Sequence, residues 1–208
     1  MTRKLFMIVF AWLAVLCTVH SQEMNDEQVK QHINKTAAAL KSMQCDFVQT
    51  KHIKLLNEDM VSKGKMYYQQ SNRLRWEYVS PYTYTFILNG SKVLLKNNKR
   101  NDVIDVNQNK MFKEIARIMM NSVVGTCLSD EKDFKASMSQ NATEWIASLQ
   151  PMRKDMRQMM QYIVLHFSKE KAMVSKVELI EKKGDKTVIE LKNIRTNAAI
   201  PANTFSVN

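Results

Sequence analysis

The chain has 208 residues and a formal net charge of +11, with only 4 Gly and 3 Pro beside 15 Met. Average usage would give roughly 15 Gly and 10 Pro in this length, so collagen-like, flexible-linker and Pro-rich disordered classes are excluded. Hydrophobic residues make up 45% of the chain and charged residues 25%. This is the composition of a globular protein with enough apolar side chains for one sizeable core.

The first 21 residues have the features of a secretory signal peptide. Arg3 and Lys4 precede an uncharged apolar run over residues 5–19. This run is shorter than the about 20 residues that a membrane-spanning helix needs. We therefore expect cleavage between Ser21 and Gln22, a single mature domain over residues 22–208, and a periplasmic location in a bacterium.

Loss of the signal peptide would leave a strongly basic chain. Removing Arg3 and Lys4 leaves 29 basic residues against 20 acidic ones. Anionic membrane surfaces or acidic partners suit this balance, whereas an exported protein rarely meets nucleic acid. An ordinary solvated surface with no specific partner explains the charge equally well.

The first half of the chain predicts one helix followed by an antiparallel meander. Asn25 and two acidic residues are typical of a helix start, and apolar residues recur at helical spacing through Met43. From Gln44 the apolar period changes to two, and Asn89-Gly90 is a two-residue hairpin signal. The predicted strands cover 44–50, 60–69, 73–79, 82–88, 92–96 and 102–106.

The second half returns to helical spacing and then to strands. A helix is predicted over 109–124, ended by Gly125 as a cap. A hairpin over 134–138 and 142–149 leads to Pro151 and a short helix with a methionine stripe at Met152, Met156, Met159 and Met160. Closing strands follow over 163–167, 174–180 and 187–191, the last two joined around Gly184. The tail 196–207 is expected to pack on the domain or to cover an edge of the sheet.

These elements predict an α+β fold. About nine to eleven strands would form a strongly curved antiparallel sheet, an unclosed barrel capped by a helical lid. Aromatic side chains on one face of consecutive strands cannot be buried within the sheet itself, so helices must close over them and leave an apolar cavity. Gly64 lies inside a strand, where a bulge or bend would help the sheet to curve.

The sequence carries no recognised catalytic or metal-binding motif. It has no Gly-x-Ser-x-Gly elbow, no phosphate-binding glycine loop and no His-Glu-x-x-His helix. Its four histidines, at positions 20, 32, 52 and 166, are scattered. We therefore expect a protein that is not an enzyme and needs no cofactor or metal.

Two cysteines remain after the signal peptide. Cys45 and Cys127 allow two interpretations. They can form a disulfide, because an oxidising compartment permits one, or they can be two separate buried thiols. The methionines also allow two interpretations. Methionine suits surfaces that accommodate variable apolar partners, but ordinary core packing explains the same pattern.

With the strands placed, the chain resembles the periplasmic outer-membrane lipoprotein carriers, the LolA-like family, from about Gln28 to Phe205. The resemblance rests on the order and spacing of short motifs. They are Phe47–Lys51, Gly64–Tyr68, Asn72–Trp76 with Pro81, Asn89-Gly90, Leu149–Pro151, Gly184–Thr187, Asn197–Pro201 and Phe205.

The resemblance implies an apolar interior that shields lipoprotein acyl chains between the inner and outer membranes. Its implied partners are acylated lipoproteins, an inner-membrane lipoprotein-releasing ABC transporter and an outer-membrane acceptor, with the carrier as a monomer. The residues that would line this cavity are Phe47, Met66, Tyr68, Leu74, Trp76, Tyr78, Phe86, Leu88, Met119 and Met156.

One position departs from the family pattern. Well-known members carry an Arg-Pro-Asn-Leu stretch whose arginine holds the lid closed, and here Gln70 takes the arginine position. Arg73 and Arg75 are nearby, but the alternation places both on the outer face. Two other functions stay open: an envelope sensor or scaffold of the same fold that binds a lipid or lipoprotein signal, and a periplasmic hydrolase of unrecognised type.

Overall fold

The computed structural model describes residues 24–108, 120–121, 128 and 132–207. The eleven strands of these ranges form one antiparallel sheet in the order β6-β5-β4-β3-β2-β1-β11-β10-β9-β8-β7. The strands are β1 (Ser42–Ile53), β2 (Glu58–Gln69), β3 (Arg73–Ser80), β4 (Tyr84–Asn89), β5 (Lys92–Asn97), β6 (Asn101–Asp105), β7 (Phe134–Gln140), β8 (Glu144–Pro151), β9 (Met160–Ser168), β10 (Met173–Glu181) and β11 (Lys186–Thr196). The helices are α1 (Asp26–Ala39), α3 (Lys154–Met159) and the 3-10 turn η2 (Ala202–Phe205).

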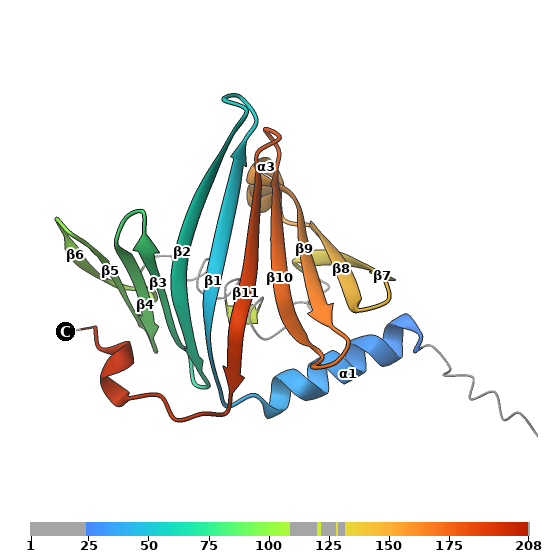
Figure 1. Cartoon of the computed structure of the whole chain (residues 1–208), viewed down its shortest axis with the longest axis horizontal. Coiled ribbons are helices and arrows are strands. Elements are labelled where there is room, and N and C mark those ends of the chain that lie inside the picture. The colour runs from blue at the N-terminus through green and yellow to red at the C-terminus, as the bar shows by residue number, and fades with distance from the viewer. Residues whose placement is uncertain (1–23, 109–119, 122–127, 129–131, 208) are drawn as a thin grey trace, which may run out of the picture.

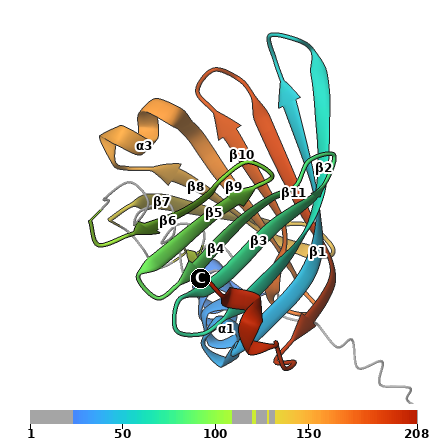
Figure 2. The ribbon, with the colours of Figure 1, turned by 90° about the vertical axis from the view of Figure 1, so that its left-hand side faces the viewer.

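The sheet is strongly curved and open. Its order ends at β6 and β7, so it does not close into a barrel. Seen from the side, both arms of the sheet bend to the same side of the central strands β1 and β2, and α1 lies within this curve (Figures 1 and 2). The predicted unclosed antiparallel sheet is confirmed. No helix within the described ranges is long and apolar enough to cross a membrane.

Helix α1 begins where the sequence predicts and ends earlier. The Asn25 side chain accepts a hydrogen bond from the Gln28 backbone, and the Gln28 side chain accepts one from the Asn25 backbone, which forms a capping box. The helix stops at Ala39 because Leu40 adopts an extended backbone. The prediction that it reaches Met43 is wrong. Met43 belongs to β1 and pairs with Tyr68 of β2.

The two faces of the sheet bury different sets of side chains. Two apolar clusters cover the inner, concave face, while a third forms on the outer face from Ile87, Leu94 and Phe205. Phe205 belongs to η2, so the C-terminal tail packs on the outside of β3 and β4 rather than along an edge strand. The Asn89 side chain fixes the tail by donating a hydrogen bond of 3.0 Å to the Phe205 carbonyl.

Gly64 lies at an irregularity of the sheet. The pairing of β2 with β3 shifts register between Lys63 and Gly64, which confirms the expected bulge. The Phe47 ring and the Glu77 carbonyl occupy the space where a Cβ atom of residue 64 would lie. Glycine at this position therefore lets the ring of Phe47 pack directly on the backbone of β2.

Several predicted features lie outside the described residues. These are the signal peptide, Gly125 and most of the helix predicted over 109–124. Within that last range the structure describes Met120 and Asn121, which are helical.

Candidate functional site

The concave face of β1 to β5 carries the first inner cluster, which gathers most of the predicted cavity residues. Seven of them are buried there, and Tyr78 is half-buried against the same cluster. The seven buried residues are Phe47, Met66, Tyr68, Leu74, Trp76, Phe86 and Leu88. Period-two alternation explains the result, because each of these residues falls on the same face of its strand.

An aromatic stack lies at the centre of the first inner cluster. Phe47 stacks on Trp76 with ring centroids 4.3 Å apart, and it meets the edge of Tyr78 at 5.2 Å. The Tyr78 hydroxyl donates a hydrogen bond of 2.9 Å to the Gln49 side chain. Burial raises the pKa of Tyr78, as it does that of Tyr68. The wall is therefore apolar and uncharged over four neighbouring strands.

The other arm of the sheet carries the second inner cluster. Val29 and Ile33 of α1 pack there against Trp145, Leu165 and Phe167 of β8 and β9. Sequence reasoning predicted these strands but did not assign their aromatic residues to the inner face. Within the range of the predicted middle helix, Met120 packs against the first inner cluster, and the nearby Leu128 is buried in the second.

The structure does not bring all ten predicted residues together. Met156 is buried in the second inner cluster, apart from the first, and Met119 lies outside the described residues. The predicted methionine stripe is wrong, because α3 has only six residues and Met160 already belongs to β9. Met152 and Met159 are exposed.

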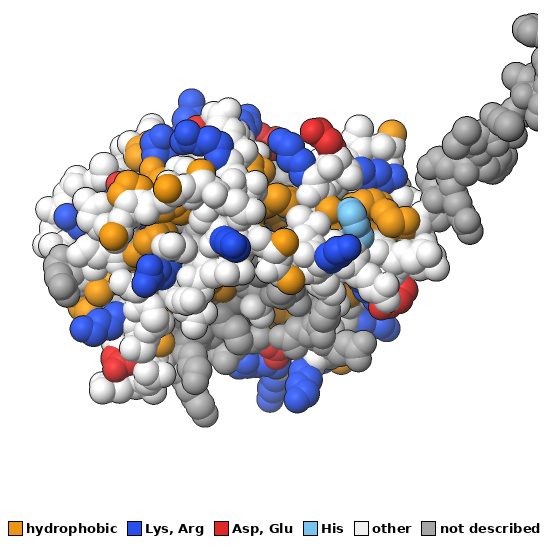
Figure 3. Space-filling view, turned by 90° about the horizontal axis from the view of Figure 1, so that it is seen from below, with side chains coloured by type: hydrophobic (Ala, Val, Ile, Leu, Met, Phe, Trp, Pro, Cys, Tyr) orange, Lys and Arg blue, Asp and Glu red, His pale blue; other side chains and the backbone are white. Residues whose placement is uncertain are grey.

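A groove opens where α1 meets the ends of β10 and β11. Its volume is about 340 Å³, and it is lined by His32, Lys35, Thr36, Ala39, Leu40, Met173, Thr196 and Asn197. Leu40 belongs to the first inner cluster and Met173 packs against it, so the groove adjoins the apolar interior. Seen from below, exposed apolar side chains are interspersed with Lys and Arg side chains over the described surface (Figure 3).

Cys45 is a buried residue of the first inner cluster. Burial, with a contribution from the neighbouring charge of Asp46, raises the pKa of its thiol to about 12. The thiol is therefore protonated at neutral pH and a poor nucleophile. Cys127 lies outside the described residues, so the disulfide stays a prediction.

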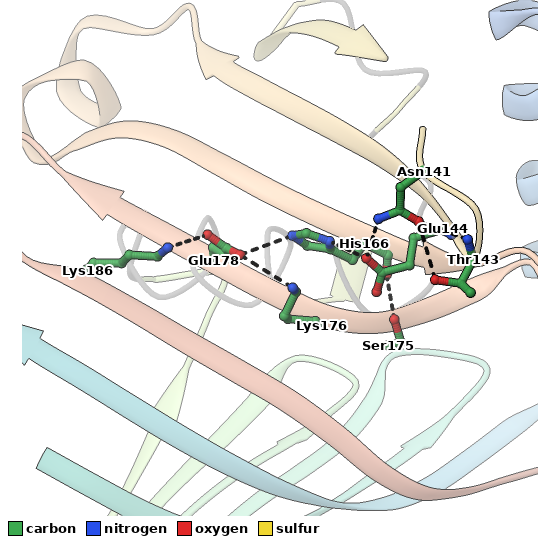
Figure 4. A network of polar contacts seen from close by, with 8 residues as sticks. All are labelled: Asn141, Thr143, Glu144, His166, Ser175, Lys176, Glu178 and Lys186. Atoms are coloured by element: carbon green, nitrogen blue, oxygen red, sulfur yellow. Dashed lines mark hydrogen bonds and ion pairs between the residues drawn. The ribbon is translucent and has the colours of Figure 1, made fainter. Parts of the chain in front are cut away.

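A polar network on the outer face joins four strands (Figure 4). His166 of β9 places Nδ1 3.1 Å from Glu144 of β8 and Nε2 3.2 Å from Glu178 of β10. Glu178 also lies 2.7 Å from the Lys186 ammonium of β11 and 3.7 Å from that of Lys176. Sequence reasoning missed this network because its members come from different strands and follow no local motif.

Both carboxylates of the network are held in their charged form. Burial raises the pKa of Glu178, but the hydrogen bond and charge of Lys186, with the charges of His166 and Lys176, outweigh it and lower that pKa below its ordinary value. For Glu144, burial is likewise outweighed by the hydrogen bonds from His166 and Asn141, and its pKa is lowered. The network therefore stabilises the fold while its carboxylates are ionised.

Acid should weaken this network. The pKa values of Glu144 and Glu178 are lower in the folded protein than in the unfolded chain. The network therefore stabilises the fold fully above the ordinary glutamate pKa of 4.5, and this stabilisation is lost as the pH falls through the pKa values of the folded state. We expect Glu178→Gln to lower the free energy of unfolding at neutral pH by about 1–3 kcal/mol. The variant should also lose less stability than the parent on acidification, which urea unfolding over a pH series measures.

The matched control is Glu190→Gln. Glu190 pairs with Lys192 at 3.2 Å, and both side chains are about half exposed, at 51% and 54%. Exposed pairs contribute little, so its effect should stay below about 0.5 kcal/mol. Equal acid sensitivity in Glu178→Gln and the parent would contradict the role of the network.

The fold and the apolar face agree with a match to a known family. The model of the family described as outer membrane lipoprotein carrier protein LolA matches residues 38–208. The chain belongs to this family. A curated relative, an outer-membrane lipoprotein carrier protein of Legionella pneumophila (strain Lens), is 24% identical over 195 residues. The match covers 93% of this chain and 92% of that protein.

Solved structures resemble the LolA-family chain in fold. An uncharacterized conserved protein of Thermus thermophilus aligns with a TM-score of 0.55 and 9% identity, over 86% of this chain and 93% of that one. A chain of the Pseudomonas aeruginosa MucA/MucB complex aligns with a TM-score of 0.50 and 12% identity over 86% of this chain. The chain spans 60% of the length of that second protein. Identities this low show the fold alone.

Gln70, for which the resemblance predicts the position of the lid arginine, lies in the turn between β2 and β3. Its side-chain Nε2 donates a hydrogen bond of 3.4 Å to the Ala38 carbonyl near the end of α1. Arg75 bonds Glu77 at 3.0 Å on the outer face, and Arg73 bonds Gln69 at 3.3 Å. The outward direction predicted for both arginines is confirmed. A neutral amide therefore connects this turn to α1.

Proposed function

We propose that the chain is a periplasmic carrier that binds the acyl chains of lipoproteins on its concave face and carries them from the inner to the outer membrane. The observation that carries this proposal is the continuous apolar wall of the first inner cluster on strands β1 to β5. Family membership supports the cargo class, because the Legionella relative is named as an outer-membrane lipoprotein carrier.

Burial of acyl chains against this wall supplies the binding energy. Each CH₂ group removed from water contributes about 0.8 kcal/mol, so a cavity that covers several chains competes with a membrane. The binding must stay moderate, because tight binding would stop delivery. Aromatic rings together with Met43 and Met66 provide a wall that adapts to different chains. The carrier performs no covalent chemistry in this proposal and needs no cofactor.

The proposal includes partners at both membranes. An inner-membrane lipoprotein-releasing ABC transporter would load the carrier, and an outer-membrane acceptor would unload it. The carrier would act as a monomer after removal of residues 1–21 by the export machinery.

Displacement of a fluorescent fatty-acyl probe tests the proposal. Purified mature protein should bind the probe saturably and release it to a triacylated lipopeptide. The same peptide without acyl chains is the control and should leave the probe bound. A folded protein that binds neither the probe nor the lipopeptide would overturn the carrier function.

A second candidate is an envelope sensor or scaffold with the same fold. Its support is the alignment with one chain of the MucA/MucB complex, because that chain has a similar fold and is part of a complex between two proteins. Gene deletion separates the two functions. Loss of a carrier should mislocalise many lipoproteins, whereas loss of a sensor should change the expression of one set of genes. A hydrolase of unrecognised type would be revealed by turnover of an acyl-ester substrate.

A further inference from the structure

The hairpin between β1 and β2 ends in an exposed apolar tip. Leu55 and Leu56 occupy its turn, and their exposed fractions are 92% and 58%. The hairpin extends beyond the neighbouring strands in two perpendicular views (Figures 1 and 2). Neither leucine belongs to an apolar cluster of the fold. Two adjacent, exposed leucines at a protruding turn form an apolar surface that is available for a partner to cover.

The tip is braced by the neighbouring hairpin between β10 and β11. The Lys54 backbone donates a hydrogen bond of 3.1 Å to the Asp185 carboxylate. The Lys51 ammonium lies 3.2 Å from the Glu181 carboxylate. Within the turn, the Leu56 backbone donates to the Ile53 carbonyl at 3.1 Å. These contacts hold the leucines outward and leave less conformational entropy to lose when they are covered.

Lysines lie near the apolar tip, together with the acidic residues Glu58, Asp59 and Asp185. Within the part of the chain that the structure describes, Lys54, Lys182 and Lys183 form no ion pair. Lys182 lies beside the end of α3, since its backbone donates a hydrogen bond of 2.9 Å to the carbonyl of Met159, a residue that is 64% exposed. Exposed apolar side chains and unpaired lysines therefore lie at the same end of the molecule.

We propose that this end of the molecule is a docking surface for anionic phospholipid membranes. Leucines at a protruding turn can enter the boundary between headgroups and acyl chains, while lysines beside them attract anionic headgroups. The surface differs from the proposed acyl-binding wall, because the leucines lie at the hairpin tip and the first inner cluster lies on the concave face. Docking through the hairpin tip would bring the carrier to a membrane surface without using the residues of its concave face.

Vesicle flotation tests the proposal with no lipoprotein present. We expect the mature protein to float with phosphatidylethanolamine vesicles that contain phosphatidylglycerol, and to float much less with neutral phosphatidylcholine vesicles. Replacing Leu55 and Leu56 together by serine should lower the partition coefficient about tenfold or more. Replacing Lys182 and Lys183 by glutamine should lower it about fivefold per charge at low salt.

Val103→Ser is the matched control. Val103 lies on β6, away from the tip, and is 54% exposed. The partition coefficient of the Val103→Ser variant should therefore stay within about twofold of that of the parent protein. Equal flotation of the double serine variant and the parent would overturn the proposal, as would a parent protein that does not float with anionic vesicles. The double serine variant should still bind the fatty-acyl probe. That readout separates failure of docking from failure of the carrier function.

Discussion

The Gly64→Ala variant is expected to lose about 3 kcal/mol or more of its free energy of unfolding. A methyl group at this position meets the Glu77 carbonyl of β3 and the Phe47 ring, and neither belongs to a flexible side-chain end. The ring is fixed by its stacking on Trp76, and the carbonyl belongs to a paired strand. Relief of the clash would therefore disturb the bulge and the aromatic stack together. Urea unfolding followed by tryptophan fluorescence measures the loss.

Gly90→Ala is the control for this prediction. Gly90 has a φ of +62°, but no atom lies within 4 Å of where its Cβ would be. Its substitution should cost only the backbone strain of about 1–2 kcal/mol. If Gly64→Ala were no more destabilising than Gly90→Ala, the close packing of Phe47 on β2 would be wrong.

The Trp76→Glu variant should lose the binding of fatty-acyl probes by about tenfold or more. Trp76 is 9% exposed and stacks on Phe47 at the centre of the first inner cluster. A carboxylate there would have to stay hydrated, and its water would occupy the surface that acyl chains cover in the proposed complex. Probe titration measures the loss, and far-UV circular dichroism verifies that the sheet is retained.

Two further variants make the Trp76→Glu result interpretable. Leu95→Glu places the same charge on the half-buried margin of the first inner cluster, on β5, where the fold tolerates it better. Leu95→Glu should also weaken binding of the fatty-acyl probe, as Trp76→Glu does. Val103→Glu places the charge on an exposed position of the opposite face and should bind the probe as the parent does. Full probe binding by a folded Trp76→Glu protein would contradict the assignment of the wall.

Sequence periodicity predicts the sheet and the side chains that share one face of it, and the family resemblance assigns these side chains to the inner wall. Alternation in 73–79 and 82–88 placed Trp76 and Phe86 on one face, and the structure pairs them directly across β3 and β4. Such predictions succeed because a strand with one buried face has only one register that keeps its apolar side chains inside. The Asn89-Gly90 turn and the bulge at Gly64 were predicted for similar local reasons.

Features that depend on distant partners were predicted less well. Met43 fits the helical spacing of α1, but pairing with Tyr68 places it in β1. The methionines after Pro151 fit a helical stripe, but pairing of β9 with β10 takes Met160 into the sheet. Likewise His166 meets Glu144 and Glu178 only because β8, β9 and β10 are neighbours. Local spacing contains no information on these contacts.

Native mass spectrometry of the protein purified from the cells that produce it tests the central claim most directly. The account predicts a population whose mass exceeds that of the chain by an acylated lipoprotein or an acyl-bearing lipid, and whose extra mass is absent from Trp76→Glu but present in Val103→Glu. A folded parent protein that carries no acyl-bearing molecule, and that takes up none when triacylated lipopeptide is added, would contradict the account.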